Sequence, residues 1–216
     1  MLAKRLAVLV VSVLVFVSNV LAQESSQSTP VNQLSVTAGR TFVSTTTIQN
    51  PPAGDPNPNI HFGNPASVAF NYGRLLISRR IFGLYAELPV AIYFKMDLNT
   101  FTNQIPKDIG AVFVTPSARL NIFSGDSVTP WVSVGGGYGR FRESSQLIFY
   151  NPNPGPTGTN TGVAQFGAGL DVWLWHRWGF RAEARDFYSG NPALNVTTTN
   201  SRQHNYYVGA GIMHRF

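Results

Sequence analysis

Eight segments in which apolar and small or polar residues alternate follow one another along the chain, and the connections between them alternate in length. The segments lie at residues 34–44, 67–77, 84–95, 109–123, 128–142, 162–175, 178–188 and 206–216. Short turns follow the second, fourth and sixth segments, whereas the other connections are long loops rich in proline, glycine and asparagine. Short turns at one end and long loops at the other are typical of an up-and-down barrel in an outer membrane. The pattern predicts an all-β fold, an eight-stranded antiparallel transmembrane β-barrel.

The two faces of each segment differ in content, and the last segment shows this most clearly. Tyr206, Val208, Ile212 and Phe216 share one face, which is bulky and apolar, whereas the other face carries glycines and Arg215. The interior of an eight-stranded barrel is just wide enough for side chains, so rows of large apolar residues fit it poorly. We therefore expect the apolar rows to face lipid and the small or polar rows to face the interior.

The composition agrees with this class of protein. Charged residues make up 12% of the chain, compared with about 25% in soluble globular domains. The chain has no cysteine, which excludes disulfides and thiolate metal sites and suits an oxidising envelope compartment. The formal net charge is +6, but the basic residues form no run or stripe, so we expect no nucleic-acid partner.

The first residues of the chain have the three parts of a secretory signal. Lys4 and Arg5 precede an apolar stretch at residues 6–17, and residues 20–22 form a small-residue cleavage site. The apolar stretch is too short to span a membrane easily, which argues against an uncleaved anchor. We predict a cleaved signal peptide at residues 1–22, a flexible polar lead at 23–33 and the barrel domain at 34–216.

Six charged residues fall on the parity that is expected to face the barrel interior, three of them acidic and three basic. They are Glu87, Arg119, Asp171, Arg181, Glu183 and Arg185. Charges at that depth persist only when they are paired and hydrogen-bonded. We expect a structural plug in the half of the barrel nearer the short turns. The alternative is a gate whose ion pairs exchange to let small ions pass.

Aromatic residues gather near the segment ends, as the interfacial girdles of a membrane barrel require. The expected girdle residues are Tyr72, Tyr85, Phe94, Phe123, Trp131, Phe141, Trp175, Trp178, Tyr188, Tyr206 and Phe216. Arg142 and Arg202 lie at the outer ends of strands, where they are candidates for contacts with lipid phosphates, the alternative being ordinary solvated arginines. The long loops are expected to be adaptable surface loops.

The glycine-rich stretch, the histidines and Ser201 are candidates for a phosphate loop, a metal site or a catalytic site, but their spacing does not favour these roles. No helix is expected after the glycine-rich residues 135–139, so we expect room for bulky side chains or a bend there, not a phosphate loop. His204 and His214 are too far apart along one strand to share a metal, and His61 with His204 would lack carboxylate ligands. Ser201 lies close to His204 in sequence, but catalysis needs an oriented nucleophile and base. We therefore expect no catalytic site, no metal and no cofactor.

The signal peptide, the eight alternating segments, WVSVGGGYGRF at 131–141, GFRAEARDFY at 179–188 and the terminal Phe216 carry a family resemblance. The chain resembles the small eight-stranded outer-membrane β-barrel superfamily, of the OmpA/OmpX-like kind, over residues 34–216. The resemblance implies the outer membrane of a Gram-negative-type bacterium. It also implies an assembly signal in the last strand, formed by Tyr206, Val208, Ile212 and Phe216. We expect no peptidoglycan tethering, because no such domain follows Phe216.

The expected function is that of a non-enzymatic integral barrel that contributes to envelope structure and presents surface loops. One alternative is a narrow pore or a channel for small hydrophobic solutes, another is a lipid-modifying enzyme, and a soluble lipocalin-like protein is the alternative outside this class. The expected partners are outer-membrane lipid and lipopolysaccharide, with the barrel-assembly machinery and periplasmic chaperones during biogenesis. The barrel is expected to be a monomer. The activity stays open among these alternatives, because fold alone does not specify it.

Overall fold

The computed structural model describes residues 31–51, 57–79, 81–123 and 127–216, and the expected signal peptide lies outside these residues. The strands are β1 (Asn32–Val43), β2 (Thr46–Thr47), β3 (Asn59–Phe62), β4 (Ala66–Ser78), β5 (Phe82–Asn99), β6 (Asp108–Val114), β7 (Ser117–Ile122), β8 (Val128–Glu143), β9 (Thr159–Trp173), β10 (Trp178–Gly190) and β11 (Arg202–Arg215). Within the described ranges there are strands and no helices, and accordingly no helix long and apolar enough to cross a membrane.

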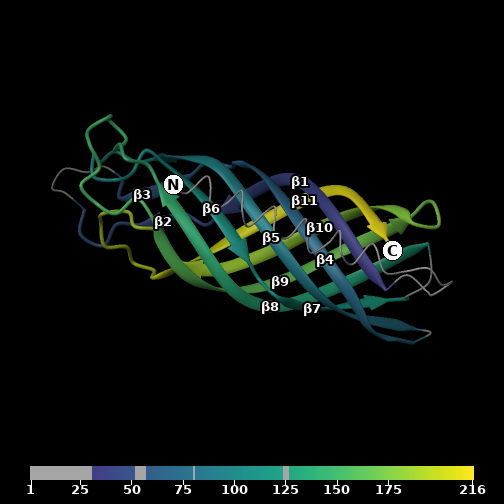
Figure 1. Ribbon diagram of the computed structural model, residues 1–216. Coiled ribbons are helices and arrows are strands. Elements are labelled where there is room, and N and C mark those ends of the chain that lie inside the picture. Colours follow the sequence, from purple (N-terminus) through teal and green to yellow (C-terminus); the bar gives the residue numbers. More distant parts are fainter. Residues whose placement is uncertain (1–30, 52–56, 80, 124–126) are drawn as a thin grey trace.

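The strands close into a single antiparallel barrel (Figure 1). β1 pairs with β4 on one side and with β11 on the other, so the first and last strands seal the wall. The ring continues through β5, then β6 and β7, then β8, β9 and β10. Because β6 and β7 follow one another along the same position, the wall has eight strand positions, and the predicted eight-stranded barrel is confirmed.

The fourth strand position is interrupted, which the sequence pattern did not predict. Thr115 and Pro116 separate β6 from β7, and the N–H of Thr115 donates to the carbonyl of Pro89 across the break at 3.1 Å. On the other side, the N–H of Gly136 donates to the carbonyl of Pro116 at 3.1 Å. A Cβ on Gly135 would collide with the Pro116 carbonyl. The glycine run therefore lets β8 approach this break closely, in agreement with the expected bend.

The outer wall carries the apolar parity of the strands. Phe166, Phe180, Val208 and Ile212 are each more than half exposed on this surface. Residues of the opposite parity are buried in the interior. This exposure of large apolar side chains is what a lipid-facing surface requires, and the predicted orientation of the rows is confirmed.

The start of β1 and the face taken by Lys95 differ from the sequence expectation. β1 begins at Asn32, so the last two residues of the expected lead, Asn32 and Gln33, belong to the barrel and are buried. In β5 the pairing register with β6 shifts between Tyr93 and Met96, which marks a β-bulge. The bulge turns Lys95 outward, although its parity in the sequence places it with the interior residues.

The aromatic girdle is smaller than predicted. Tyr85, Trp131 and Phe141 are buried in the interior, with exposed fractions of 5%, 1% and 1%. Their place near the segment ends was misleading, because parity and not position along the strand decides which face a side chain takes. The exposed members are Phe94, Phe123, Trp175, Trp178 and Tyr206, and the partly exposed ones are Tyr72, Tyr188 and Phe216.

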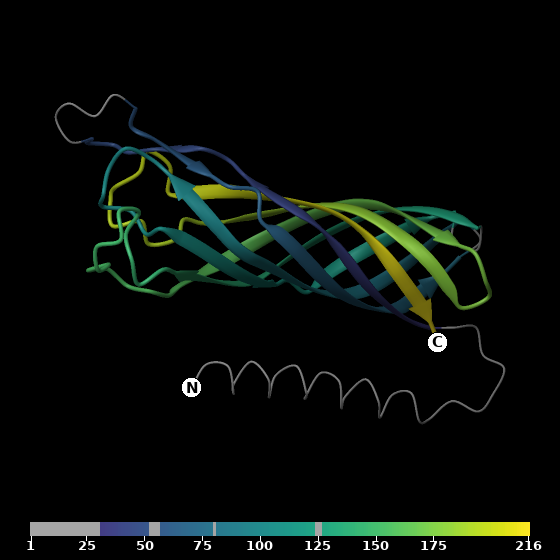
Figure 2. The same ribbon diagram turned by 90° about the horizontal axis from the view of Figure 1, so that it is seen from above.

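The long loops gather at one end of the barrel and contact one another, whereas the C-terminus lies at the opposite end (Figure 2). The loop between β1 and β4 contains the small strands β2 and β3, and its Ile48 forms a bridge with Thr198. Asn195 donates hydrogen bonds to the carbonyl of Gln104 and to Asn153, which belong to two other loops. The loops are thus tied into a cap, which the expectation of adaptable loops did not anticipate.

Candidate functional site

The six charged residues predicted for the interior all lie there, and the structure brings them into one network. Glu87 comes from β5, Arg119 from β7 and Asp171 from β9, whereas Arg181, Glu183 and Arg185 occupy alternate positions of β10. Alternation along a strand sends every second side chain to the same face, which places the three β10 residues in one inward row. Each of the six is at most 3% exposed.

Arg181 connects the carboxylates of Asp171 and Glu87. Its Nε lies 2.8 Å from Asp171 Oδ1 and its Nη2 lies 2.8 Å from Asp171 Oδ2, so the pair is bidentate. Its Nη1 donates to Glu87 Oε1 at 3.1 Å. A guanidinium that satisfies two carboxylates in fixed geometry makes stronger and more directional bonds than a neutral donor.

Glu87 is shared among three arginines. Besides Arg181, it accepts a hydrogen bond from Arg185 Nη2 at 3.1 Å, and Arg119 Nε lies 3.2 Å from its Oε1. The Arg119 contact is an ion pair without hydrogen-bond geometry, whereas Arg119 Nη1 donates to Asp171 Oδ2 at 3.0 Å. Arg185 is also bonded to Glu183, Nε to Oε2, at 2.9 Å. Three acids and three bases therefore neutralise one another within a connected cluster.

Neutral polar side chains from β1 and β4 surround the ion pairs. Thr37 donates to Glu183 at 2.5 Å, Asn71 donates to the same carboxylate at 3.3 Å, and Gln33 accepts from Arg119 at 2.5 Å. Ser35 accepts from Arg181 at 3.1 Å. Buried charges are tolerated when their remaining donors and acceptors are satisfied in this way.

Trp131 lies at the centre of this network, although its sequence position suggested an interfacial residue. Its indole N–H donates to Asp171 at 3.0 Å. The guanidinium carbons of Arg185 and Arg181 lie 5.0 Å and 5.1 Å from its ring centroid, in cation–π contacts. Trp131 has the same parity along the strand as Thr129 and Ser133, which predicts that it faces the interior. Gly169 leaves room for its ring, because a Cβ on Gly169 would collide with the indole.

A second layer fills the interior nearer the long loops, and it is mainly apolar. The ring of Phe113 lies 5.0 Å from Tyr93, 5.6 Å from Phe141 and 5.4 Å from Phe187, measured between centroids. Ile48, Ile60, Ile105 and Leu194 extend this cluster into the loops. This layer was missed, because large apolar residues were expected only in the lipid-facing rows, although parity places Phe187 inside with Arg181 and Arg185.

The two layers lie in series between the short turns and the loop cap. An ion that entered from the short turns would meet the ion pairs and then the aromatic cluster. Transfer of a charge into an apolar environment is unfavourable unless it is paired and hydrogen-bonded. The interior is therefore filled by an ion-pair layer and an aromatic layer.

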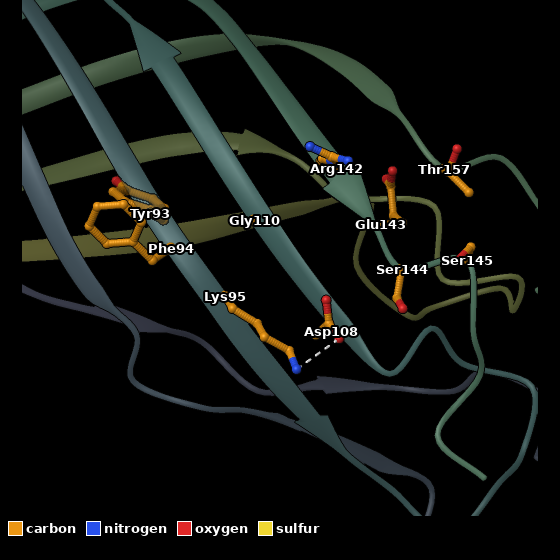
Figure 3. Close-up of a pocket in the computed structure, with 10 residues that line it drawn as sticks. All are labelled: Tyr93, Phe94, Lys95, Asp108, Gly110, Arg142, Glu143, Ser144, Ser145 and Thr157. Atoms are coloured by element: carbon orange, nitrogen blue, oxygen red, sulfur yellow. Dashed lines mark ion pairs between the residues drawn. The ribbon is translucent and has the colours of Figure 1, made fainter. Parts of the chain in front are cut away.

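The two arginines considered for lipid phosphates lie on the outer surface near the loops, in separate grooves. Arg142 lines a groove of about 500 Å³ over Gly110, beside the ion pair that joins Lys95 and Asp108 at 3.3 Å (Figure 3). Arg202 lines another groove of about 450 Å³, with its guanidinium carbon 5.6 Å from the centroid of Tyr188. The structure does not bring the two together, and their contact with phosphates stays a prediction.

The histidines are dispersed. His204 Nδ1 lies 2.7 Å from Asp186 Oδ2 on the outer wall, and Ser201 lines the same groove. Ser44 accepts a hydrogen bond from the backbone N–H of His204 at 3.3 Å, so its hydroxyl is bound to the backbone and not to the imidazole. Within the described ranges, no three histidine or carboxylate side chains are grouped so that they could hold a metal ion.

The residues of the expected assembly signal line the outside of the closing strand. Tyr206, Val208 and Ile212 are exposed on the outer wall of β11. Phe216 exchanges two backbone hydrogen bonds with Asn32, each 2.9 Å long, and so completes the seam between the first and last strands. Recognition of this strand by an assembly machinery remains a prediction.

No protein-family model and no curated protein matches the chain. Solved structures do match. Neisserial surface protein A is 14% identical with a TM-score of 0.52, and the match covers 86% of this chain and 97% of that one. OprG from Pseudomonas aeruginosa is 11% identical with a TM-score of 0.53, and the shares covered are 89% and 99%. AlkL, determined in lipid bilayers, is 14% identical with a TM-score of 0.52, and the shares are 89% and 93%.

These likenesses show the fold, and they do not carry an activity to this chain. The fold is that of the small eight-stranded outer-membrane β-barrel superfamily. Its apolar outer wall is the surface that such a barrel turns toward lipid. The chain therefore has the fold of the integral β-barrels of the bacterial outer membrane.

Proposed function

We propose that the chain is a non-enzymatic barrel that contributes to envelope structure and presents its tied loops at the cell surface. The observation that carries this proposal is the filled interior, in which a neutral ion-pair layer is followed by an aromatic layer. Both layers connect strands that are distant in sequence, so their natural role is to hold the barrel wall together. Short turns face the periplasm in such barrels, and the loop cap accordingly faces outward.

A narrow pore is the second candidate, and one feature favours it. Glu87 lies within ion-pair distance of three arginines, so it can keep one partner while it releases another. Such an exchange would open only the layer near the short turns. The ring cluster of Phe113 and Phe187 would still block the path, which is why the structural role is the better supported of the two.

A deletion strain distinguishes these candidates. If the barrel is structural, its loss is expected to increase envelope stress and the entry of a bulky hydrophobic dye, and the wild-type gene should reverse both effects. If it is a pore, its loss should instead reduce the uptake of a small solute while the envelope remains intact. That second result would contradict the proposal.

The proposed partners are outer-membrane lipid and lipopolysaccharide, with the assembly machinery and chaperones during biogenesis, and the barrel is proposed to be a monomer.

Deletion of Phe216 removes the last pair of backbone hydrogen bonds at the seam and the terminal aromatic residue. We expect much lower levels of folded barrel in the membrane, measured by heat-modifiable gel mobility. Normal levels of the shortened chain would contradict this role of Phe216, and Phe180→Ala on the outer wall serves as a matched loss of an aromatic residue.

A further inference from the structure

The two ends of the barrel balance their exposed charges differently. At the long-loop end, acidic side chains lie among the basic ones, and Lys95 lies 3.3 Å from Asp108 while His204 lies 2.7 Å from Asp186. At the short-turn end, the charged side chains outside the interior network are all arginines among the described residues, namely Arg74, Arg79, Arg177 and Arg215. Arg80 and Asp126 lie outside the described residues. The short-turn end is therefore a basic rim.

Two of the rim arginines are free to bind a ligand. Arg74 continues the outward row of β4, opposite Asn32 in the register with β1, and Arg177 lies in the turn between β9 and β10. Both are exposed. Within the described part of the chain, neither guanidinium has a hydrogen bond or an ion pair with another side chain. Arg215 is held differently, because its Nε donates to the carbonyl of His176 at 2.5 Å.

Exposed apolar side chains lie near these arginines along the chain. In the hairpin of β4 and β5, Leu76 and Ile81 are 58% and 64% exposed, and both lie within a few residues of Arg74 or Arg79 along the chain. Trp175 and Trp178 are 67% and 49% exposed beside Arg177. Exposed apolar surface that continues a lipid-facing wall is expected to stay in contact with lipid. The arginines therefore lie where the hydrocarbon of a membrane ends and its head groups begin.

We propose that this basic rim binds the phosphate groups of anionic phospholipids in the periplasmic leaflet. A guanidinium donates two parallel hydrogen bonds to a phosphate, and its aliphatic stem can lie along apolar neighbours. The long-loop end carries acids such as Asp108 and Asp186 beside its basic side chains, whereas the rim has no such acids among the described residues. The inference rests on the membrane position of the barrel and goes beyond its proposed structural role.

The test uses the whole barrel in nanodiscs that contain equal amounts of phosphatidylcholine and phosphatidylglycerol. Both leaflets then have the same composition, so a difference between the two ends comes from the protein. The lipids retained after mild detergent extraction are counted by native mass spectrometry. Wild-type protein is expected to retain phosphatidylglycerol in preference to phosphatidylcholine, and the preference should decrease as salt screens the phosphate contacts.

The variant Arg74→Gln/Arg177→Gln is expected to lose this preference several-fold. An upper bound of about 25-fold follows from roughly fivefold for each arginine near an anionic surface. Arg40→Gln/Arg140→Gln is the matched control, because it removes two exposed arginines from β1 and β8 toward the opposite end. The control should retain the wild-type preference.

The proposal is overturned if the rim variant keeps the wild-type preference, or if the control loses it to the same extent. Arg74→Lys/Arg177→Lys keeps both charges, and we expect most of the preference to remain. If the glutamine variant fails to fold, the wild-type salt dependence decides, because a preference unchanged by salt contradicts binding by charge. A conducting wild-type barrel would refute the closed interior but would leave this inference standing.

Discussion

The interior near the short turns and the interior near the long loops are both filled with side chains, but the first is held by ion pairs and the second by apolar packing. In the first, Arg181, Asp171 and Glu87 are fixed by ion pairs of 2.8 to 3.1 Å, each of which needs a defined partner. In the second, the rings of Phe113 and Phe187 stack at 5.4 Å and need only complementary shape. The polar layer therefore depends on every member, whereas the apolar layer depends on filled volume.

One strand contributes to both layers. Arg181, Arg185 and Phe187 share the inward parity of β10, and they succeed one another from the short-turn end toward the loops. The alternation of the strand decides that all three point inward. The residue type then decides which layer each one joins, so the boundary between the layers is set by sequence and not by a change of backbone.

The largest effect is expected from Glu87→Ala, which removes a carboxylate shared by three arginines. Because the guanidinium groups would remain buried without compensation, the free energy of unfolding should fall by about 3–5 kcal/mol. Equilibrium unfolding in urea from lipid vesicles measures the change, and Asp171→Ala should behave similarly. Arg140→Ala on the exposed wall is the control. A change below about 1 kcal/mol for both interior variants would contradict the role of the network as a plug.

A slightly smaller loss is expected from Phe113→Ala, which leaves a cavity among Tyr93, Phe141 and Phe187. The free energy of unfolding should fall by about 3 kcal/mol, measured in the same way. Phe113→Leu should restore much of it, whereas Glu87→Gln should not restore the ion pairs. If Phe113→Leu and Glu87→Gln recovered the free energy of unfolding equally, the two layers would not differ in the way proposed.

Adding volume to the apolar layer is expected to cost less than removing it. A Cβ on Gly139 would lie 2.5 Å from the ring of Phe113, whereas a Cβ on Gly162 would meet no atom within 4 Å. Gly139→Val should therefore lower the free energy of unfolding by about 1–3 kcal/mol relative to Gly162→Val, measured by urea unfolding. Equal stability of the two variants would show that the aromatic layer is loosely packed.

The smallest effect is expected from Lys95→Ala, which removes an ion pair on the outside of the barrel. The Lys95 side chain is 59% exposed, so the loss of its pairs with Asp97 and Asp108 should change the free energy of unfolding by at most about 1 kcal/mol. The same urea titration measures it. A loss comparable to that of Glu87→Ala would mean that burial does not explain the strength of the interior network.

Much of the fold follows from the sequence, because strand parity and loop length are local properties. The polar layer could also be predicted, since charges such as Glu87 and Asp171 within otherwise apolar or small-residue strands have few places where they are tolerated. The sequence did not predict which acid pairs with which arginine, because the contacts of Arg181 with Asp171 and Glu87 depend on how β10, β9 and β5 are placed around the ring.

The apolar layer could not be predicted in the same way. Parity places Phe113 inward with Arg119 and Phe141 inward with Trp131, but both are bulky apolar residues of the kind expected in a lipid-facing row. The outward turn of Lys95 depends on a bulge, which adds a residue to one strand without a signal in the alternation. The cap formed by the loops rests on contacts between segments distant in sequence.

Single-channel recording in planar bilayers tests most directly whether two independent layers close the interior. Four proteins are compared: wild type, Glu87→Ala/Arg185→Ala to open the polar layer, Phe113→Ala/Phe187→Ala to open the apolar layer, and the quadruple variant. We predict that the first three are silent and that only the quadruple variant conducts. Conductance by wild-type protein, or by the variant in which only the polar layer is opened, would contradict the account.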